Sequence, residues 1–214
     1  MALRDILAGK DTGFGRGILS IVDRDGGSVA HWLAEKNAAA LRDIVAGNDV
    51  VFGRDILSIL DQDGTWVAHW LAIYNGATLR DILARNDVVF GRDILSIRDQ
   101  GGRSVAHWLA ADIGSSLREI LAEKDDGFVR DILSIATPEG HTVASYLAEF
   151  NGVALRDIVA GKDDGFVREI LSIPDQDGQG RTVSDVLFDK SPDVLRAIAP
   201  DRFARYPAVG ASVA

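Results

Sequence analysis

The residues best suited to chemistry are carboxylates and a histidine that recur together. The stretch DQDGTWVAHWLA, residues 61–72, contains Asp61, Asp63 and His69. Two aspartates before a glycine resemble the start of a calcium loop, but such a loop also needs a bidentate acidic ligand at its twelfth position. That position is Ala72, and the matching turns of two later copies read DQGG and TPEG. The pattern therefore does not predict a calcium site.

The histidines recur at a spacing that excludes one shared metal ion. His31, His69 and His107 are evenly spaced and stand at equivalent positions in successive copies of a repeat. Stacked helices lie about 8–10 Å apart, whereas zinc holds its histidine nitrogens at about 2 Å. One ion cannot bridge such a ladder, and the chain has no cysteine to supply thiolate ligands. We expect no metal site, no cofactor and no disulfide.

Catalysis needs a constellation of residues that occurs once, and little in this chain occurs once. His141 and Ser145 are four residues apart and could meet on a helix, with Glu139 nearby. No third group and no set of oxyanion donors can be named beside them. The sequence therefore predicts a protein that is not an enzyme.

The elements that position these residues belong to one unit copied five times. The period is about 38 residues, which lies within the range typical of stacked repeat proteins. The fifth copy contains two additional residues, Gln179 and Gly180. We predict a single array over 1–206 and a frayed tail over 207–214. The copies span residues 3–40, 41–78, 79–116, 117–154 and 155–194, and a partial copy spans 195–206.

Each copy predicts three short helices and one turn. In the second copy, apolar residues at helical spacing begin at Leu41, at Phe52 and at Val67. Asp49 is expected to cap the helix that contains Phe52, and the pair Asn75–Gly76 is expected to form a left-handed stop. Helices this short are unstable alone, so the copies must stack. Because no apolar run alternates as a strand would, we expect an all-α fold without a sheet.

The turn and the helix after it resemble the signature of the ankyrin repeat, D-x-x-G-x-T followed by P-L-H-x-A-A. The first copy reads DRDGGSVAHWLA, and the resemblance recurs at the fixed period. It implies that each histidine hydrogen-bonds the turn backbone and links one copy to the next. It also implies that the turn tips and the helix ends line a concave surface for protein partners. The matching glycines and histidines are Gly26, Gly64, Gly102, His31, His69 and His107.

The chain also departs from that family. Its period exceeds the roughly 33 residues of an ankyrin unit. The additional length is the helix typified by DVVFGRDILSI, and Val replaces the Pro of the signature. The predicted fold is therefore an ankyrin-like α-solenoid of five stacked 38-residue helical repeats. An armadillo- or HEAT-like stack of three-helix units is the alternative.

Aromatic and charged residues also recur as rows. We interpret Trp32 and its counterparts as space-filling residues between copies, and the two arginine rows as inter-copy ion pairs. Trp66 differs because it stands where other copies place Ser or Thr at the helix N-cap. Losing such a cap costs on the order of 1 kcal/mol. An exposed tryptophan at that position is a candidate anchor for a partner.

Comparing the copies with one another identifies a candidate binding surface. The positions that differ most between copies lie before the turn, after the turn glycine and at the end of the signature helix. Scatter on one surface over a constant frame is typical of a recognition scaffold, although neutral drift at exposed sites gives the same pattern. The predicted partner contacts are Trp66, Ile73, Tyr74, Arg98, Arg103 and Phe150.

Composition narrows the class of partner. The 214-residue chain has a net charge of −9, which disfavours direct nucleic-acid binding because that needs cations to neutralise phosphates. A protein with a basic patch is the expected partner. No apolar run approaches the roughly 20 residues that span a bilayer, and Arg4 and Asp5 stand where a signal peptide needs an apolar core. We expect a soluble, cytoplasmic protein without a membrane partner.

The function predicted from the sequence is non-enzymatic protein–protein recognition. One alternative is an acidic mimic of DNA, or an inhibitor of a basic nucleic-acid-binding protein. Another is an engineered or structural repeat protein without a dedicated partner. The array begins in mid-unit at Leu3 without an obvious polar cap. Three explanations are open: a homodimer covers the ends, the chain is a piece of a longer array, or the first copy frays.

Overall fold

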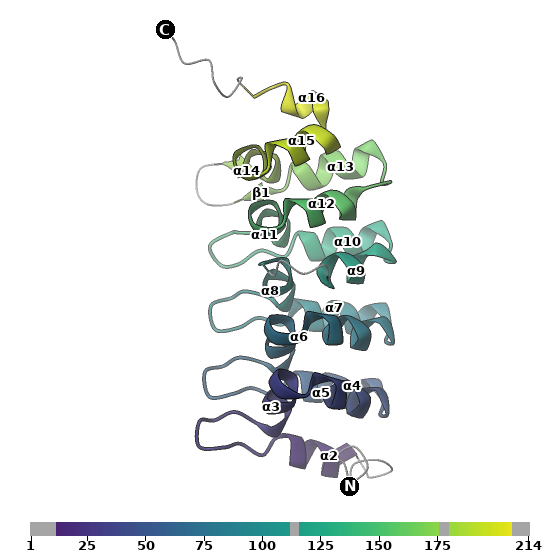
Figure 1. Ribbon diagram of the computed structural model, residues 1–214, viewed down its shortest axis with the longest axis vertical. Coiled ribbons are helices and arrows are strands. Elements are labelled where there is room, and N and C mark those ends of the chain that lie inside the picture. Colours follow the sequence, from purple (N-terminus) through teal and green to yellow (C-terminus); the bar gives the residue numbers. More distant parts are fainter. Residues whose placement is uncertain (1–11, 112–115, 176–179, 207–214) are drawn as a thin grey trace.

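The computed structural model describes residues 12–111, 116–175 and 180–206, which form an elongated stack of short helices (Figure 1). These residues are mostly helical, which confirms the all-α class. The start of the first copy, 3–11, and the tail 207–214 lie outside the described residues. None of the described helices is both long and apolar enough to cross a bilayer.

Three kinds of helix recur, and each kind stacks on its own kind to form a column. The signature helices, which carry the histidines, are α3 (Val29–Lys36), the first half of α6 (Val67–Ala84), α8 (Val105–Ala111), α11 (Val143–Phe150) and α14 (Val183–Lys190). The second helices are α4 (Ala38–Ala46), the second half of α6, α9 (Ser116–Ala122), α12 (Gly152–Val159) and α15 (Pro192–Ile198). The third helices are α2 (Thr12–Leu19), α5 (Val50–Leu57), α7 (Val88–Ser96), α10 (Asp126–Leu133) and α13 (Asp164–Leu171), and the short α16 (Pro200–Phe203) follows α15.

Apolar side chains at matching positions bury themselves between successive copies. The third helices bury a column of phenylalanines, and the second helices bury a column of leucines. Each such side chain contributes about 1.5–3 kcal/mol when it leaves water, so these columns hold the stack together. Their members are Phe52, Phe90, Phe128 and Phe166, and Leu41, Leu79, Leu117, Leu155 and Leu195.

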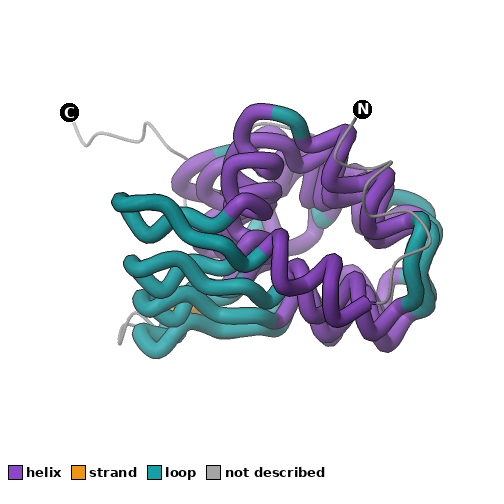
Figure 2. Tube along the Cα trace, turned by 90° about the horizontal axis from the view of Figure 1, so that it is seen from below, coloured by secondary structure: helices purple, strands orange, loops and turns teal. Residues whose placement is uncertain are grey.

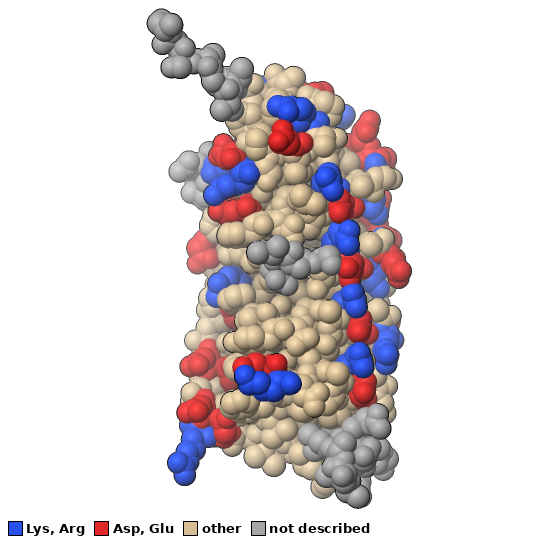
Figure 3. All heavy atoms as spheres, in the orientation of Figure 1, with Lys and Arg blue, Asp and Glu red and all other residues tan. Residues whose placement is uncertain are grey.

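Ion pairs join the copies at the surface, as the arginine rows predicted. An arginine of one third helix pairs with the acid of the next, and a second ladder joins the second helices. Figure 3 shows basic and acidic groups alternating down one edge of the stack. Pairs as exposed as these contribute only about 0–1 kcal/mol each. They are Arg16–Asp55, Arg54–Asp93, Arg92–Asp131 and Arg130–Glu169, and Arg42–Asp81, Arg80–Glu119 and Arg118–Asp157.

The predicted aspartate caps are present at all four of the predicted positions that the structure describes. The Asp49 carboxylate, for example, accepts the Phe52 backbone N–H at 2.8 Å. A cap of this kind satisfies a backbone donor that a helix start leaves free. The other caps are Asp87, Asp125 and Asp163, while Asp11 lies outside the described residues.

The predicted left-handed stop at Asn75–Gly76 is wrong. Asn75 has φ −154° and ψ 54°, and it forms a kink inside α6. Gly76 has no positive φ. A Cβ on Gly76 would lie 2.8 Å from the hydroxyl of Ser116 in the next copy. This glycine therefore serves the close approach of two copies, and not a left-handed backbone conformation.

A β-hairpin precedes every signature helix, and the hairpins project together from one side of the stack (Figure 2). In the fifth copy the two sides pair as strands β1 (Pro174–Asp175) and β2 (Arg181–Thr182). The expectation of no sheet is therefore wrong here, because two residues a side are too few to show strand alternation in the sequence. The turns rely on left-handed φ angles of +74°, +69° and +76° at Gly26, Gly64 and Gly102, which glycine adopts without strain.

Candidate functional site

A buried histidine links each of the first three hairpins to the next copy. In the first copy, the Ser28 backbone N–H donates to His31 Nδ1 over 3.3 Å, and the Ser28 hydroxyl lies 2.7 Å from the same atom. His31 Nε2 then lies 3.1 Å from the carbonyl oxygen of Thr65 in the second copy. An acceptor at Nδ1 and a donor at Nε2 define a neutral imidazole. The hydrogen bond to the neighbouring turn is the one that the family resemblance implied.

The same link recurs in the next two copies. His69 Nε2 lies 3.3 Å from the Arg103 carbonyl oxygen, and His107 Nε2 lies 3.1 Å from that of His141. Burial disfavours the charged form of each ring. It lowers the pKa of all three histidines, and that of His107 to about 4. The imidazoles therefore serve as neutral structural groups at neutral pH.

The second copy lacks part of this arrangement. Trp66 stands at the N-cap of α6 and makes no capping hydrogen bond. His69 Nδ1 is consequently buried without a partner among the described residues. Trp66 is half-buried rather than exposed, which corrects the prediction, because its indole N–H donates to the Arg98 carbonyl oxygen over 2.7 Å. Its ring joins the second hairpin to the third.

Both predicted arginine contacts also hold hairpins in place. The exposed guanidinium of Arg98 donates to the carbonyl oxygens of Gly102 and Ala136, each over 2.7 Å, and so bridges the third and fourth hairpins. Arg103 lies over the ring of Trp108 within its own copy. Both side chains therefore contact other groups of the chain, and each has a structural role besides its predicted binding role.

The other three predicted contacts are exposed at the ends of signature helices. Ile73, Tyr74 and Phe150 have exposed fractions of 40%, 53% and 51%. Ile73 and Tyr74 are neighbours at one helix end, whereas Phe150 lies two copies further along the stack. The exposed apolar side chains therefore form two separate clusters at the signature-helix ends and not one continuous patch.

Ring contacts fix the positions of these exposed aromatics. In the second copy, the Tyr74 ring packs against Trp70 at a centroid distance of 5.4 Å, and Trp70 packs against His31 at 5.5 Å. In the fourth copy, Phe150 packs against Tyr146 at 5.6 Å. A side chain that is already positioned loses less entropy when a partner binds it.

The structure does not form a catalytic pair from His141 and Ser145. The Ser145 hydroxyl donates to the Thr142 carbonyl oxygen at 2.9 Å, inside the cap of α11. His141 Nδ1 instead lies 2.9 Å from the Asp175 carboxylate in the next hairpin. The two side chains thus serve different local contacts.

The sequence reasoning missed a pocket of about 270 Å³ between the first two copies. Trp32 lines this pocket and is 48% exposed, so the interpretation of that residue as space-filling is wrong. The signal that could have revealed it is an aspartate nine residues before a tryptophan, which occurs in three copies. Its aromatic and acidic lining consists of Trp32 and Trp70 together with Asp23, Asp25, Glu35, Asp61 and Asp63.

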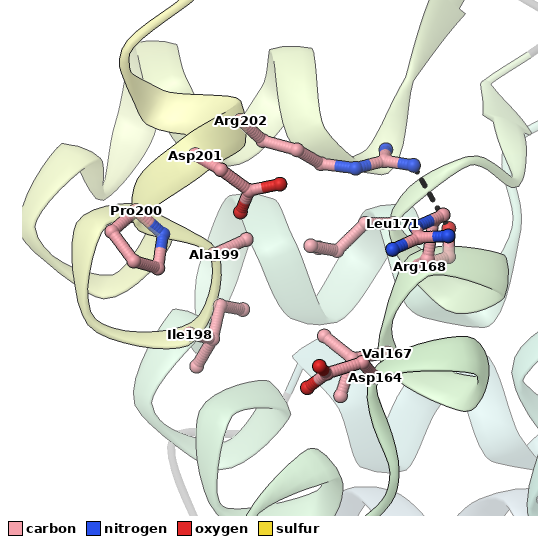
Figure 4. A pocket seen from close by; sticks show the side chains of 9 residues that line it. All are labelled: Asp164, Val167, Arg168, Leu171, Ile198, Ala199, Pro200, Asp201 and Arg202. Carbon is pink, nitrogen blue, oxygen red and sulfur yellow. Dashed lines mark hydrogen bonds between the residues drawn. The ribbon is translucent and has the colours of Figure 1, made fainter.

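A second cleft of about 270 Å³ lies at the C-terminal end of the stack (Figure 4). Arg202 extends across it from α16 and donates to the Arg168 carbonyl oxygen and the Ser172 hydroxyl. Asp164 and Asp201 also line the cleft, so both signs of charge are present. Arg202 therefore joins the last short helix to α13.

Comparisons with known proteins do not place the chain in a family. No family model matches it, and no curated protein matches it by sequence. Among solved structures, it is similar to a chain in that of the Bd0816 predatory endopeptidase from Bdellovibrio bacteriovorus in complex with immunity protein Bd3460. The identity is 14% and the TM-score 0.49, over 94% of this chain and 97% of that one. A likeness at this level carries no argument about function.

Proposed function

We propose that this chain is a non-enzymatic scaffold that binds another protein through its hairpins and the ends of its signature helices. The observation that carries the proposal is the exposure of Ile73, Tyr74 and Phe150 at those helix ends. Aromatic and aliphatic side chains exposed in water are unfavourable for solubility, and such residues supply much of the binding energy at protein interfaces.

We also propose that the array is an ankyrin-like solenoid. Two features support this over an armadillo- or HEAT-like stack. Each copy has a turn ahead of its signature helix, as ankyrin repeats do. A buried histidine also donates to the next turn in three successive copies. The third helix of each copy is an addition to that plan.

Charge favours a basic partner. The chain carries a net charge of −9. Asp23, Asp25, Asp61 and Asp63 gather around the pocket between the first two hairpins. Complementary charge speeds association and weakens with salt. A partner with a basic patch should therefore bind fastest at low ionic strength.

Affinity capture from a lysate of the source organism tests the binding role. The native chain is compared with a face variant, Ile73→Ser, Tyr74→Ser and Phe150→Ser combined. The matched control is Val51→Ser with Val89→Ser, because these valines are 63% and 61% exposed on the third helices, away from the hairpins. Circular dichroism first establishes that all three proteins fold alike.

The proposal predicts one protein that the native chain and the valine control retain and that the face variant loses. Equal capture by all three proteins would reject this face. Loss of the same protein by the valine control alone would place the binding surface on the third helices instead.

A further inference from the structure

The third copy binds one of its own arginines in a notch between an aspartate and a tryptophan. The Trp108 indole N–H donates to Asp99 Oδ2 over 2.9 Å. Arg103 Nε lies 3.3 Å from the same carboxylate oxygen, and its guanidinium carbon lies 4.0 Å from the ring centroid of Trp108. The notch thus holds a guanidinium by its face and by one edge. We call this pairing of residues the aspartate–tryptophan notch.

The first copy has the same notch without an arginine. The Trp32 indole N–H donates to Asp23 Oδ2 over 2.5 Å, as Trp108 does to Asp99. Gly27 stands at the position of Arg103, where a Cβ would lie 3.6 Å from the indole nitrogen and 3.8 Å from the Asp23 carboxylate. The indole hydrogen bond holds the Asp23 pKa below its usual value, so this carboxylate is charged at neutral pH. The first notch is therefore preformed and open.

The open notch faces the pocket of about 270 Å³ between the first two copies. A second indole–carboxylate pair, Trp70 to Asp61 at 2.9 Å, lines the same pocket. Asp25 and Asp63 also line it, and within the described part of the chain none of the four aspartates forms an ion pair with a Lys or Arg, whereas Glu35 pairs with Lys36. The pocket therefore presents two indole rings and unneutralised negative charge.

A guanidinium fits this lining better than other cations do. It is planar, so it can stack on an indole while its N–H groups donate to a carboxylate in the ring plane. An ammonium group offers the same charge without the flat face. Arg103 demonstrates both contacts at once in the third copy.

We propose that the pocket between the first two copies binds an arginine side chain of the partner. This inference rests on the proposed function, because it specifies the chemistry of the basic partner. The arginine would stack on Trp32 and donate to Asp23, in the way that Arg103 uses Trp108 and Asp99. Trp70 and Asp61 line the same pocket.

A peptide titration followed by NMR reads out the notch alone. The probe is N-acetyl tetra-arginine amide, and the signals are the indole N–H resonances of the four tryptophans. The Trp32 resonance, and that of Trp70 across the pocket, should shift with the peptide, while Trp108 should not, because Arg103 already occupies its notch. Tetra-lysine should bind several-fold more weakly, and tetra-citrulline, which lacks the charge, should cause no shift.

Two variants test the notches in opposite directions: one fills the open notch of the first copy, and the other opens the filled notch of the third copy. Gly27→Arg should fill the first notch from within the chain and weaken peptide binding at Trp32 about tenfold, the change expected from losing one stacked, charge-assisted contact. Gly27→Ala is its matched control and should leave the affinity unchanged. Arg103→Gly should open the third notch, so that the Trp108 resonance then responds to the peptide.

The inference is overturned if the Trp32 resonance ignores tetra-arginine, if tetra-lysine binds equally well, or if Gly27→Arg binds like the native chain. Its failure is distinct from failure of the proposed function. Capture that depends on Tyr74 and Phe150 but is unchanged by Gly27→Arg would retain the scaffold and reject the arginine pocket. Loss of both capture and peptide binding in Gly27→Arg supports the two together.

Discussion

His31 Nε2 lies 3.1 Å from the carbonyl oxygen of Thr65, 34 residues away in the next copy. The same bond recurs from His69 and from His107 at the same separation. Each bond spans an interface between copies, where it adds a second donor to a carbonyl oxygen that already accepts a backbone N–H of its own hairpin. The histidine side chain, which ordinarily suggests catalysis or metal binding, therefore acts here as a structural link. Its loss should lower the free energy of unfolding.

Replacing His107 by Leu removes one such link while keeping a side chain of similar size. The carbonyl oxygen of His141 then loses one of its two donors, and the backbone N–H of Ser104 loses its acceptor next to the core. We expect the free energy of unfolding to fall by about 2 kcal/mol, since each lost hydrogen bond costs about 0.5–1.5 kcal/mol and the Ser104 N–H is left without an acceptor. Urea unfolding measures the change. A loss below about 0.5 kcal/mol, the lower end of the range for one hydrogen bond, would show that the bond contributes little.

Stability should also fall as the pH drops from 6.5 toward 4. The pKa of His107 is about 4 in the folded chain and 6.5 in its ordinary state, so the unfolded chain binds the proton more tightly. The stabilisation is present above pH 6.5 and is lost as the pH falls. For His107 alone the loss between pH 7 and pH 5 is about 2 kcal/mol.

Urea unfolding at pH 7 and pH 5 tests this dependence, because the usual carboxylate pKa values lie below that interval. The variant His107→Leu should show a smaller difference between the two pH values than the native chain. An identical difference in both proteins would mean that His107 does not carry the pH dependence.

Trp66→Ser should stabilise the chain. Serine at this N-cap restores the arrangement of the first and third copies, where a hydroxyl lies 2.7 Å from the histidine Nδ1. The cap and the satisfied nitrogen of His69 should outweigh the lost Trp66 hydrogen bond, for a net gain of about 1 kcal/mol. Thermal unfolding measures the change. A destabilised variant would show that the tryptophan belongs to the core of the hairpin stack.

The buried columns, and not the ion-pair ladders, should supply most of the stability. Phe90→Ala removes a fully buried ring from the third-helix column and should cost about 3–5 kcal/mol. Arg92→Ala breaks the surface pair with Asp131, 2.8 Å long and about half exposed, and should cost less than about 1 kcal/mol. Urea unfolding of both variants decides the order. Equal losses would contradict this division.

Much of the fold follows from the sequence because the period repeats the same evidence five times. The caps at Asp49 and Asp87 and the inter-copy pairs such as Arg54–Asp93 could be predicted from residue type and spacing. The kink at Asn75 could not, because its backbone conformation, which Asn37 and Asn151 share, belongs to the junction of two helices and not to a turn pattern. The small sheet was missed for a similar reason, since its pairing is set by the hairpin and not by a pattern of apolar residues.

The candidate site was harder to predict. Exposure at Tyr74 and Phe150 follows from positions that vary between copies, but Arg98 lies at an equally variable position and donates to a neighbouring hairpin. Trp66, at a position that is otherwise Ser or Thr, also donates to the next hairpin. Sequence variation marks a surface without saying which side chains already have a partner. The open notch at Trp32 depends on the absence of a side chain at Gly27, which becomes meaningful only beside Arg103 in the folded chain.

The most direct test of the account is the affinity of the purified captured partner for three proteins, measured by calorimetry at low and at high salt. We predict that the face variant, Ile73→Ser, Tyr74→Ser and Phe150→Ser combined, binds at least about tenfold more weakly than the native chain. The control, Val51→Ser with Val89→Ser, should bind as the native chain does, and all affinities should fall with salt. Native affinity in the face variant, or a weaker complex only in the valine control, would contradict recognition through the hairpins and signature-helix ends.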